Sequence, residues 1–212
     1  MTRPYDFEKP DHIRGILRLL LGNGLITSEG DVHRFQRKNL SPKFSFRYIK
    51  DLYPLMWSKS VELVNCINAQ ASGISKRSCV IEVNEWAGRV TLDIIGVAAL
   101  GRDFNSLRNN NDELAALYQW LFHFDKSKKL WFLITQFIPR KVIDMLPWRT
   151  HREMILSSRE LRRVCGHLLR DKRNAMSRTA VERVDTLSHL ISSNNFSDEE
   201  LIDQLLTMLA AG

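Results

Sequence analysis

Cysteine is scarce in this chain and long apolar runs are absent, and each absence excludes a class of protein. The three cysteines form no C-x-x-C pair and show no metal-ligand spacing, which is typical of free thiols in an intracellular protein and predicts no metal site. No segment approaches the roughly 20 apolar residues of a membrane span, and the first residues lack a signal-peptide pattern. From the chain alone we therefore expect a cytoplasmic location.

Size and charge set the next limits. With 212 residues, 44% of them apolar and 26% charged, the chain is long enough for one domain with a real core. The net charge of +7 fits an acidic partner, nucleic acid, an anionic membrane or a basic docking face. The densest basic run, over residues 159–173, is interleaved with leucine and valine at helical spacing. We therefore expect an amphipathic helix with a solvated basic face there, and no nucleic-acid binding.

The order of helix signals predicts an all-α fold with no linker that would divide it. Ser28 and Asp31 form a start signal for a helix that Pro42 must end, and Asn84 is expected to cap a helix that Gly101 closes. In the latter helix, Val90, Ile94, Val97 and Ala98 are expected to share the buried face. The predicted helices cover 11–21, 28–42, 46–71, 84–100, 112–124, 128–144, 150–175, 186–192 and 197–212, with one short β-like run at 79–83.

The last of these helices has the clearest pattern. Ser197 and Glu200 have the spacing of a capping box, and Phe196 and Leu201 have that of a hydrophobic staple. Leucines recur at 201, 205 and 209, so one broad face is expected to be buried. The helix then becomes small at residues 210–212, a composition that usually lets a ligand or another backbone come close.

The segment that is chemically most informative is the short basic helix after Glu29. His33 and Arg37 are four residues apart and so lie on one helix face, with Arg34 and Lys38 as a second such pair. A guanidinium can bind a carboxylate through two hydrogen bonds, and a ring N–H one turn away suits the same ligand. The pair therefore indicates a carboxylate site, with a solvated basic helix as the alternative.

The same segment continues as Arg-Lys-x-Leu-x-Pro-x-Phe over residues 37–44. In order and spacing this resembles the cytochrome P-450 monooxygenases, the haem-thiolate enzymes. In that family the helix carries Trp-x-x-x-Arg, and both side chains hold a propionate of the haem (heme). The resemblance implies that Arg37 binds the propionate and that His33, whose ring N–H can also donate, stands at the position of the Trp.

Three further segments carry the same resemblance. The run Thr-x-Asp-x-Ile-Gly-x-x-Ala-x-Gly-x-Asp-Phe-x-Ser-Leu over residues 91–107 is similar to the fungal and animal fatty-acid-hydroxylase-like branch of the family. Residues 185–201 resemble the lead into the family's central helix. Ala211 and Gly212 resemble the first two residues of that helix's Ala/Gly-Gly-x-Asp/Glu-Thr pattern.

The resemblance implies a partial cytochrome P-450 fold over residues 1–212, from about the B helix to the early I helix. The N-terminal sheet and the C-terminal cysteine loop are not part of it. The acid–threonine pair and the cysteine ligand are expected beyond Gly212, so we expect no catalytic residue and no metal ligand in the chain, and no activity from it alone. Cys165 precedes Gly166 but lacks the upstream Phe and Gly of the ligand loop, so we expect an ordinary helix cysteine.

The cofactor and partners that the resemblance implies are haem, a small hydrophobic organic substrate and an NADPH-dependent reductase. Such an enzyme inserts one oxygen atom from O2 into its substrate, and a full-length relative is expected at the endoplasmic reticulum membrane surface. Residues 11–27 would lie over the distal side of the haem, and 117–148 would form the roof of the access channel. Phe122, Phe124 and Ala211 are the expected channel residues.

A second hypothesis belongs to a different class. The chain would then be a non-catalytic helical protein that binds a partner through an exposed apolar face. A reading frame that continues after Gly212 with Gly-x-x-Thr, Glu-x-x-Arg and the cysteine loop would establish the first hypothesis.

Overall fold

The computed structural model describes residues 5–72, 80–108, 112–122, 125–138, 140–178 and 185–211. Within these ranges the regular structure is helical and no β-strand occurs, which confirms the predicted all-α class. The elements are α1 (Asp11–Leu21), α2 (Gly30–Leu40), the 3-10 helix η1 (Ser41–Phe44), α3 (Phe46–Asp51), α4 (Tyr53–Ser72), α5 (Val83–Ile95), the π-helical turn η2 (Gly96–Leu100), α6 (Glu113–Phe122), α7 (Lys126–Phe137), α8 (Arg140–Met145), α9 (Arg149–Arg178), α10 (Thr186–Ser193) and α11 (Asp198–Ala211).

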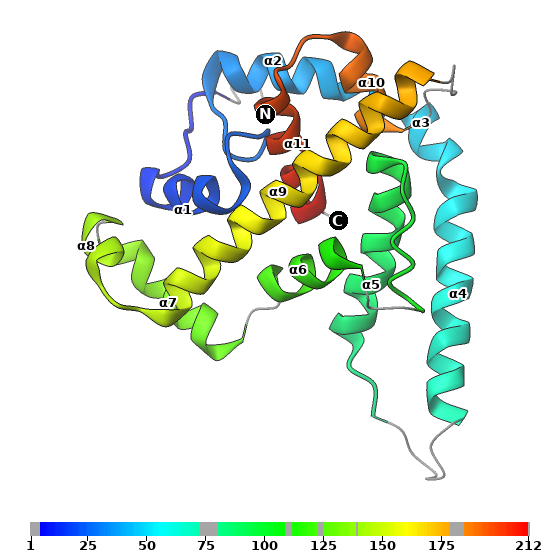
Figure 1. Ribbon diagram of the computed structural model, residues 1–212, viewed down its shortest axis with the longest axis horizontal. Coiled ribbons are helices and arrows are strands. Elements are labelled where there is room, and N and C mark those ends of the chain that lie inside the picture. Colours follow the sequence, from blue (N-terminus) through cyan, green and yellow to red (C-terminus); the bar gives the residue numbers. More distant parts are fainter. Residues whose placement is uncertain are drawn as a thin grey trace.

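The 30-residue helix α9 runs diagonally across the molecule and organises it (Figure 1). Helices α1, α6, α7, α10 and α11 all pack against α9. On one side, α4 lies beside α5, and α5 continues through η2 toward α10 and α11. The molecule is therefore a helical assembly around α9 and α11, with α4 at its edge.

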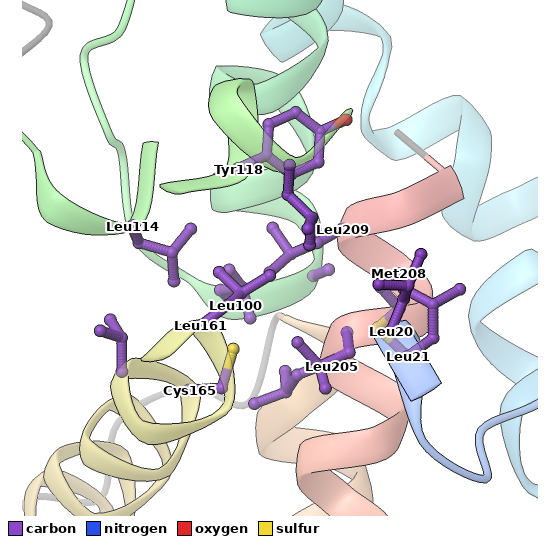
Figure 2. Close-up of a cluster of buried hydrophobic side chains, with 14 of the residues drawn as sticks. Leu20, Leu21, Leu100, Leu114, Tyr118, Leu161, Cys165, Leu205, Met208 and Leu209 are labelled. Atoms are coloured by element: carbon purple, nitrogen blue, oxygen red, sulfur yellow. The ribbon is translucent and has the colours of Figure 1, made fainter. Parts of the chain in front are cut away.

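The core is built on α11, as the leucine spacing predicts. Leu201, Leu205 and Leu209 are buried, and they face Leu161 and Cys165 of α9. Figure 2 shows this cluster, to which α1, α6 and η2 add their own side chains. The capping box is confirmed because the Ser197 N–H donates to Glu200 Oε2 at 2.8 Å and the Glu200 N–H donates to Ser197 Oγ at 3.3 Å. Helix α11 lies at the centre of the molecule because burying this apolar face removes it from water.

The polar side chains of α11 hold the connection between α1 and α2. Asp203 Oδ2 accepts the Asn23 N–H at 2.7 Å, and Gln204 Oε1 accepts the Leu25 N–H at 3.2 Å. Arg162 of α9 also pairs with the Asp203 carboxylate. The loop approaches α11 so closely that a Cβ on Gly24 would overlap Thr207 Oγ1 and lie 2.5 Å from the Asp203 carbonyl oxygen. This loop is thus clamped against the central helix.

Two predicted helix caps are wrong. Ser28 does not cap α2; its hydroxyl donates to the carbonyls of Asn23 at 3.0 Å and Gly24 at 2.9 Å, so it stabilises the loop before the helix. Asn84 does not cap α5, because Glu82 does so and its carboxylate accepts the Asn84 N–H at 3.3 Å. Residues 80–82 of the predicted β-like run do not form a strand, and Cys79 lies outside the described residues.

The predicted buried face of α5 is only partly correct. Ala98 is buried, but Val90, Ile94 and Val97 are half-buried, and the fully buried side includes Asp93. Two features that cannot be read from the apolar pattern explain why the buried face differs from the predicted one. The Asp93 carboxylate accepts the N–H groups of Ser106 at 2.7 Å and Leu107 at 3.3 Å, which turns it inward. The π-helical turn η2 then shifts the register before the helix ends.

That end is as predicted, since Gly101 closes η2 in the left-handed region at φ 67°. The helix predicted over residues 46–71 is instead divided into α3 and α4, with Pro54 in the first turn of α4. The segment predicted over residues 128–144 forms two helices, α7 and α8.

We expect Gly24→Ala to lower the free energy of unfolding by about 1–3 kcal/mol, because the added methyl overlaps α11. Gly88→Ala is the matched control: it lies inside α5 with no atom within 4 Å of an added Cβ, so stability should rise by roughly 1 kcal/mol. Urea unfolding followed by circular dichroism measures both. Equal midpoints for the two variants would contradict the clamped loop.

Candidate functional site

The exposed face of α2 carries an arginine that is available to a ligand. Arg37 is exposed and forms no ion pair with the part of the chain that the structure describes. Arg34, on the neighbouring face, is already engaged: it pairs with Asp31 at 2.7 Å and its guanidinium lies 4.8 Å from the centre of the Tyr5 ring. Of the two arginines on this helix, Arg37 is therefore the one with its charge available for a ligand.

His33 lies beside this cation and is neutral near pH 7. Its Nδ1 is 3.3 Å from the Tyr5 hydroxyl, and the two rings meet edge-to-face with centroids 5.7 Å apart. Partial burial lowers the pKa of His33, and the positive charges of Lys9 and Arg37 lower it further. A neutral ring keeps one N–H to donate, so the pair combines a full positive charge with a neutral donor.

This donor set fits a carboxylate such as a haem propionate. A hydrogen bond on the buried side of α2 fixes the position of the His33–Arg37 pair. There, Gln36 donates to the Asn23 carbonyl at 3.0 Å. Asn23 is itself bound to α11 through Asp203. The His33–Arg37 pair is therefore held in a defined place relative to the central helix.

The cysteines that the structure describes do not form a ligand site. Cys165 is completely buried in the core, and burial raises the pKa of its thiol to about 12. It is thus protonated at neutral pH, whereas a metal-ligating cysteine is a thiolate. Cys66 is half-buried on α4 and free. Over the described ranges, no three or more His, Cys, Asp or Glu side chains gather where they could hold a metal ion.

An apolar pocket of about 280 Å³ lies between α1, α7, α8 and α9. Its wall is mostly aliphatic and aromatic, and Trp131 Nε1–H donates to His151 Nδ1 at 3.2 Å, which orients both rings. Its lining residues are Asp11, His12, Gly15, Ile16, Leu19, Trp131, Thr135, Ile138, Ile143 and His151. This pocket lies in the segments for which the sequence predicts substrate access.

Of the three expected channel residues, Ala211 alone has a described side chain, and it does not line this pocket. It is exposed at the end of α11. Phe122 ends α6, but its side chain lies outside the described residues, as does the whole of Phe124. The sequence does contain a sign of this wall, because Trp131, Thr135 and Ile138 recur at helical spacing and so share one helix face. It does not show which other helices that face meets.

The described helices include none that is both long enough and apolar enough to span a membrane.

Fold and site together define an all-helical chain in which an exposed arginine and a partly buried histidine lie on a helix that is tied to the buried central helix. The family model for Cytochrome P450 matches residues 4–212, and the chain belongs to this family.

Individual relatives agree. The chain is 37% identical over 216 residues to the cytochrome P450 monooxygenase sphH of Aspergillus fumigatus, covering 100% of this chain and 40% of that protein. It is 33% identical to FUM15 of Gibberella moniliformis, covering 100% of this chain and 37% of the relative. With buaD of Petromyces alliaceus it shares 33% identity over 98% of this chain and 39% of the relative. The chain thus spans about 40% of the length of these proteins.

We expect the pKa of His33 to lie below 6.5 in the folded chain and to rise in Arg37→Gln, because that change removes one of the positive charges. Arg34→Gln is the matched control and should change it less. Histidine NMR titration measures each value. Since the unfolded chain takes up this proton more readily, stability should be lost as the pH falls through 6.5. Equal shifts in the two variants would contradict the placement of Arg37.

We expect the Cys165 thiol to resist a thiol reagent at pH 9 until the chain is unfolded, because its pKa is raised from 9.0 to about 12. The measurement uses the Cys66→Ser/Cys79→Ser variant, which retains Cys165 alone. A Cys165→Ser/Cys79→Ser variant, retaining the half-buried Cys66, should react in the folded state. The stabilising contribution of Cys165 is present below pH 9 and lost as the pH rises toward 12.

Proposed function

We propose that this chain is the helical middle part of a haem-dependent monooxygenase. The whole enzyme would insert one oxygen atom from O2 into a small hydrophobic organic substrate, with electrons from an NADPH-dependent reductase. The family match over residues 4–212 and relatives named as monooxygenases support this reaction class. Haem, when bound, would supply the oxygen-activating chemistry. For the full-length protein we propose the endoplasmic reticulum membrane surface as its location.

The observation that carries the proposal is the unpaired Arg37 beside a neutral His33. In our proposal Arg37 donates two hydrogen bonds to a haem propionate and neutralises its charge. When the Tyr5 hydroxyl donates to Nδ1 of His33, the ring proton stays on Nε2, which then donates to the same carboxylate. Arg34 takes no part, since Asp31 already occupies it.

The apolar pocket between α1, α7, α8 and α9 is our candidate for substrate access. Its aliphatic and aromatic wall excludes water and favours a hydrophobic molecule. Several polar groups at this wall already have partners: Trp131 donates to His151, Asp11 pairs with Arg14, and Thr135 donates to the Phe132 carbonyl. A small apolar substrate would therefore enter without leaving many buried polar groups unpaired.

The iron ligand in this proposal comes from the part of the family domain outside these residues. Cys165 cannot serve, because its buried thiol stays protonated. The part of the chain described here would bind the propionate edge of the haem and contribute to the substrate path. We accordingly expect no oxygen activation from the 212 residues alone.

The exposed face of α4 favours the second hypothesis, a helical protein that binds a partner. Tyr53 and Trp57 stack with ring centroids 6.4 Å apart and are each 63% exposed, and Val61 and Val64 extend the face. In the monooxygenase proposal, the remaining 60% or so of the family domain is what would cover this face. Haem binding separates the two hypotheses.

We expect the expressed chain to bind haem and Arg37→Gln to weaken that binding roughly tenfold to a hundredfold, because a hydrogen-bonded contact to a charged group contributes about 1.5–3 kcal/mol. Arg34→Gln, with the same charge change on the same helix, should stay within about twofold, because this arginine is already paired. Soret absorbance titration measures the affinities. Haem dimethyl ester, which lacks the carboxylates, should bind both variants equally.

Equal losses in the two variants, or no haem binding at all, would contradict the proposed propionate site and favour the partner-binding hypothesis. A thiolate-type Soret band in the reduced carbon monoxide difference spectrum of the chain alone would instead contradict the assignment of the ligand to another part of the domain.

A further inference from the structure

A groove of about 820 Å³ runs along the first half of α9, beside the end of α1. Four of its lining residues come from one face of α9, at spacings of three, four and seven residues: Arg152, Ile155, Leu156 and Arg159. The opposite wall includes Leu19 of α1, which also lines the apolar pocket, so the groove and the pocket share this wall. The groove is therefore apolar at its middle and cationic on either side.

The groove is a built feature of the fold. The Ser158 hydroxyl donates to the Leu19 carbonyl at 3.1 Å and to the Leu20 carbonyl at 3.0 Å, which fixes the end of α1 against α9. Ser158 is buried, so these hydrogen bonds are protected from water. The distance between the Leu19 wall and the two arginines on α9 is thus set by two hydrogen bonds.

The positive charge of the groove has no counterpart in its wall. The lining residues include no acid, and two of the four arginines among them are already paired with carboxylates elsewhere in the chain. The other two, Arg152 and Arg159, are exposed and make no ion pair with any residue of the described ranges. Guanidinium groups bind carboxylates through paired hydrogen bonds, so these two are complementary to acidic side chains.

The shape of the groove favours a helix as its occupant. Leu156 and both free arginines are exposed, so the groove is open to solvent. A small molecule lying there would keep much of its surface in water, whereas ligand pockets usually bury most of a small ligand. A helix needs to bury only one apolar face. The α9 side of the groove, from Arg149 to Arg162, is about 20 Å long, which matches a helix of roughly 13 residues.

The spacing of the two free arginines defines the pattern that such a helix must carry. Arg152 and Arg159 lie about 10 Å apart along the axis of α9, which is two helical turns. A second helix lying alongside brings acidic side chains to both of them if its acids are seven residues apart. Aliphatic residues three and four positions after the first acid then face Ile155 and Leu156. A second copy of this chain is disfavoured, because two molecules of net charge +7 repel each other.

We propose that this groove binds an acidic amphipathic helix of a partner protein. Two acidic side chains of the partner pair with Arg152 and Arg159, and the aliphatic residues between them pack on Ile155, Leu156 and the Leu19 wall. The mode is that of a helix laid into a groove with anchors at helical spacing. The inference goes beyond the proposed function, since neither haem nor substrate takes part and the His33–Arg37 pair lies on a different helix.

A labelled synthetic peptide tests the proposal by fluorescence anisotropy with the haem-free chain. The peptide is alanine-rich, about 16 residues long, with glutamates seven residues apart and leucines three and four positions after the first glutamate. We expect one peptide to bind per chain and added salt to weaken binding. A scrambled peptide of the same composition, and a peptide with both glutamates replaced by glutamine, should each bind at least tenfold more weakly.

Variants of the chain test each part of the groove. Arg152→Gln/Arg159→Gln should lower the affinity for the peptide about tenfold or more, because both ion pairs are lost. The matched control, Arg47→Gln/Arg178→Gln, removes two exposed arginines, on α3 and on the last turn of α9, and should change it less than twofold. Leu156→Ser, at an exposed position, should lower it about fivefold. Far-UV circular dichroism checks that every variant folds.

A charge reversal supplies the sharpest test of the pairing. Arg152→Glu/Arg159→Glu should no longer bind the acidic peptide. It should instead bind a peptide with lysines in place of the two glutamates, at least tenfold more tightly than the unaltered chain does. This gain cannot arise from a general loss of structure.

The proposal is overturned if the scrambled peptide binds as tightly as the designed one, if the control arginines matter as much as the groove pair, or if the charge reversal restores no binding. It is also overturned if the groove binds phosphatidylserine vesicles but not the peptide, or if sedimentation shows a dimer that Leu156→Ser dissociates. Because no haem is present, these results are independent of the haem titration that tests the proposed function.

Discussion

The arrangement of this molecule depends on one buried carboxylate, that of Asp203 on the central helix. It accepts the Asn23 N–H at 2.7 Å and pairs with Arg162 of α9, so it joins the α1–α2 connection, α9 and α11 at one point. A carboxylate removed from water requires such partners, because an unpaired buried charge is strongly destabilising. A Cβ on Gly22 would overlap both Asp203 and Arg162, so the approach also requires glycine there.

Both candidate sites derive their position from this junction. Gln36 fastens α2 to the same Asn23 that Asp203 binds, and this places His33 and Arg37 relative to α11. On the other side, α1 is held against α9 by Ser158, and this places the wall shared by the pocket and the groove. The apolar pocket and the His33–Arg37 pair thus lie on α1 and α2, the two helices that this clamped connection joins.

Helix α4 shows the opposite arrangement of charge and apolar surface. Its one fully buried side chain is Lys59, which contacts Asp103 at 2.7 Å, Glu62 at 3.3 Å and Asp93 at 3.6 Å. Burial opposes the lysine charge, but these carboxylates outweigh it and raise the pKa of Lys59. Because the charges turn inward toward α5, the aromatic and aliphatic residues of α4 face outward. Exposed apolar side chains that gather on one face in this way usually mark an interaction surface.

The sequence by itself determined the all-α class, the family, the leucine face and capping box of α11, and the His33–Arg37 pair on one face of α2. These follow from local rules, since helical periodicity, caps and four-residue spacing involve residues close in the chain. Only the tertiary structure decided that Asp93 is buried and Ser28 is not a cap, because their partners are supplied by the loops around them. It also decided that α1, α7, α8 and α9 enclose the pocket and that Arg37, not Arg34, is unpaired. Such contacts depend on which elements meet in space, and no single helix pattern contains that information.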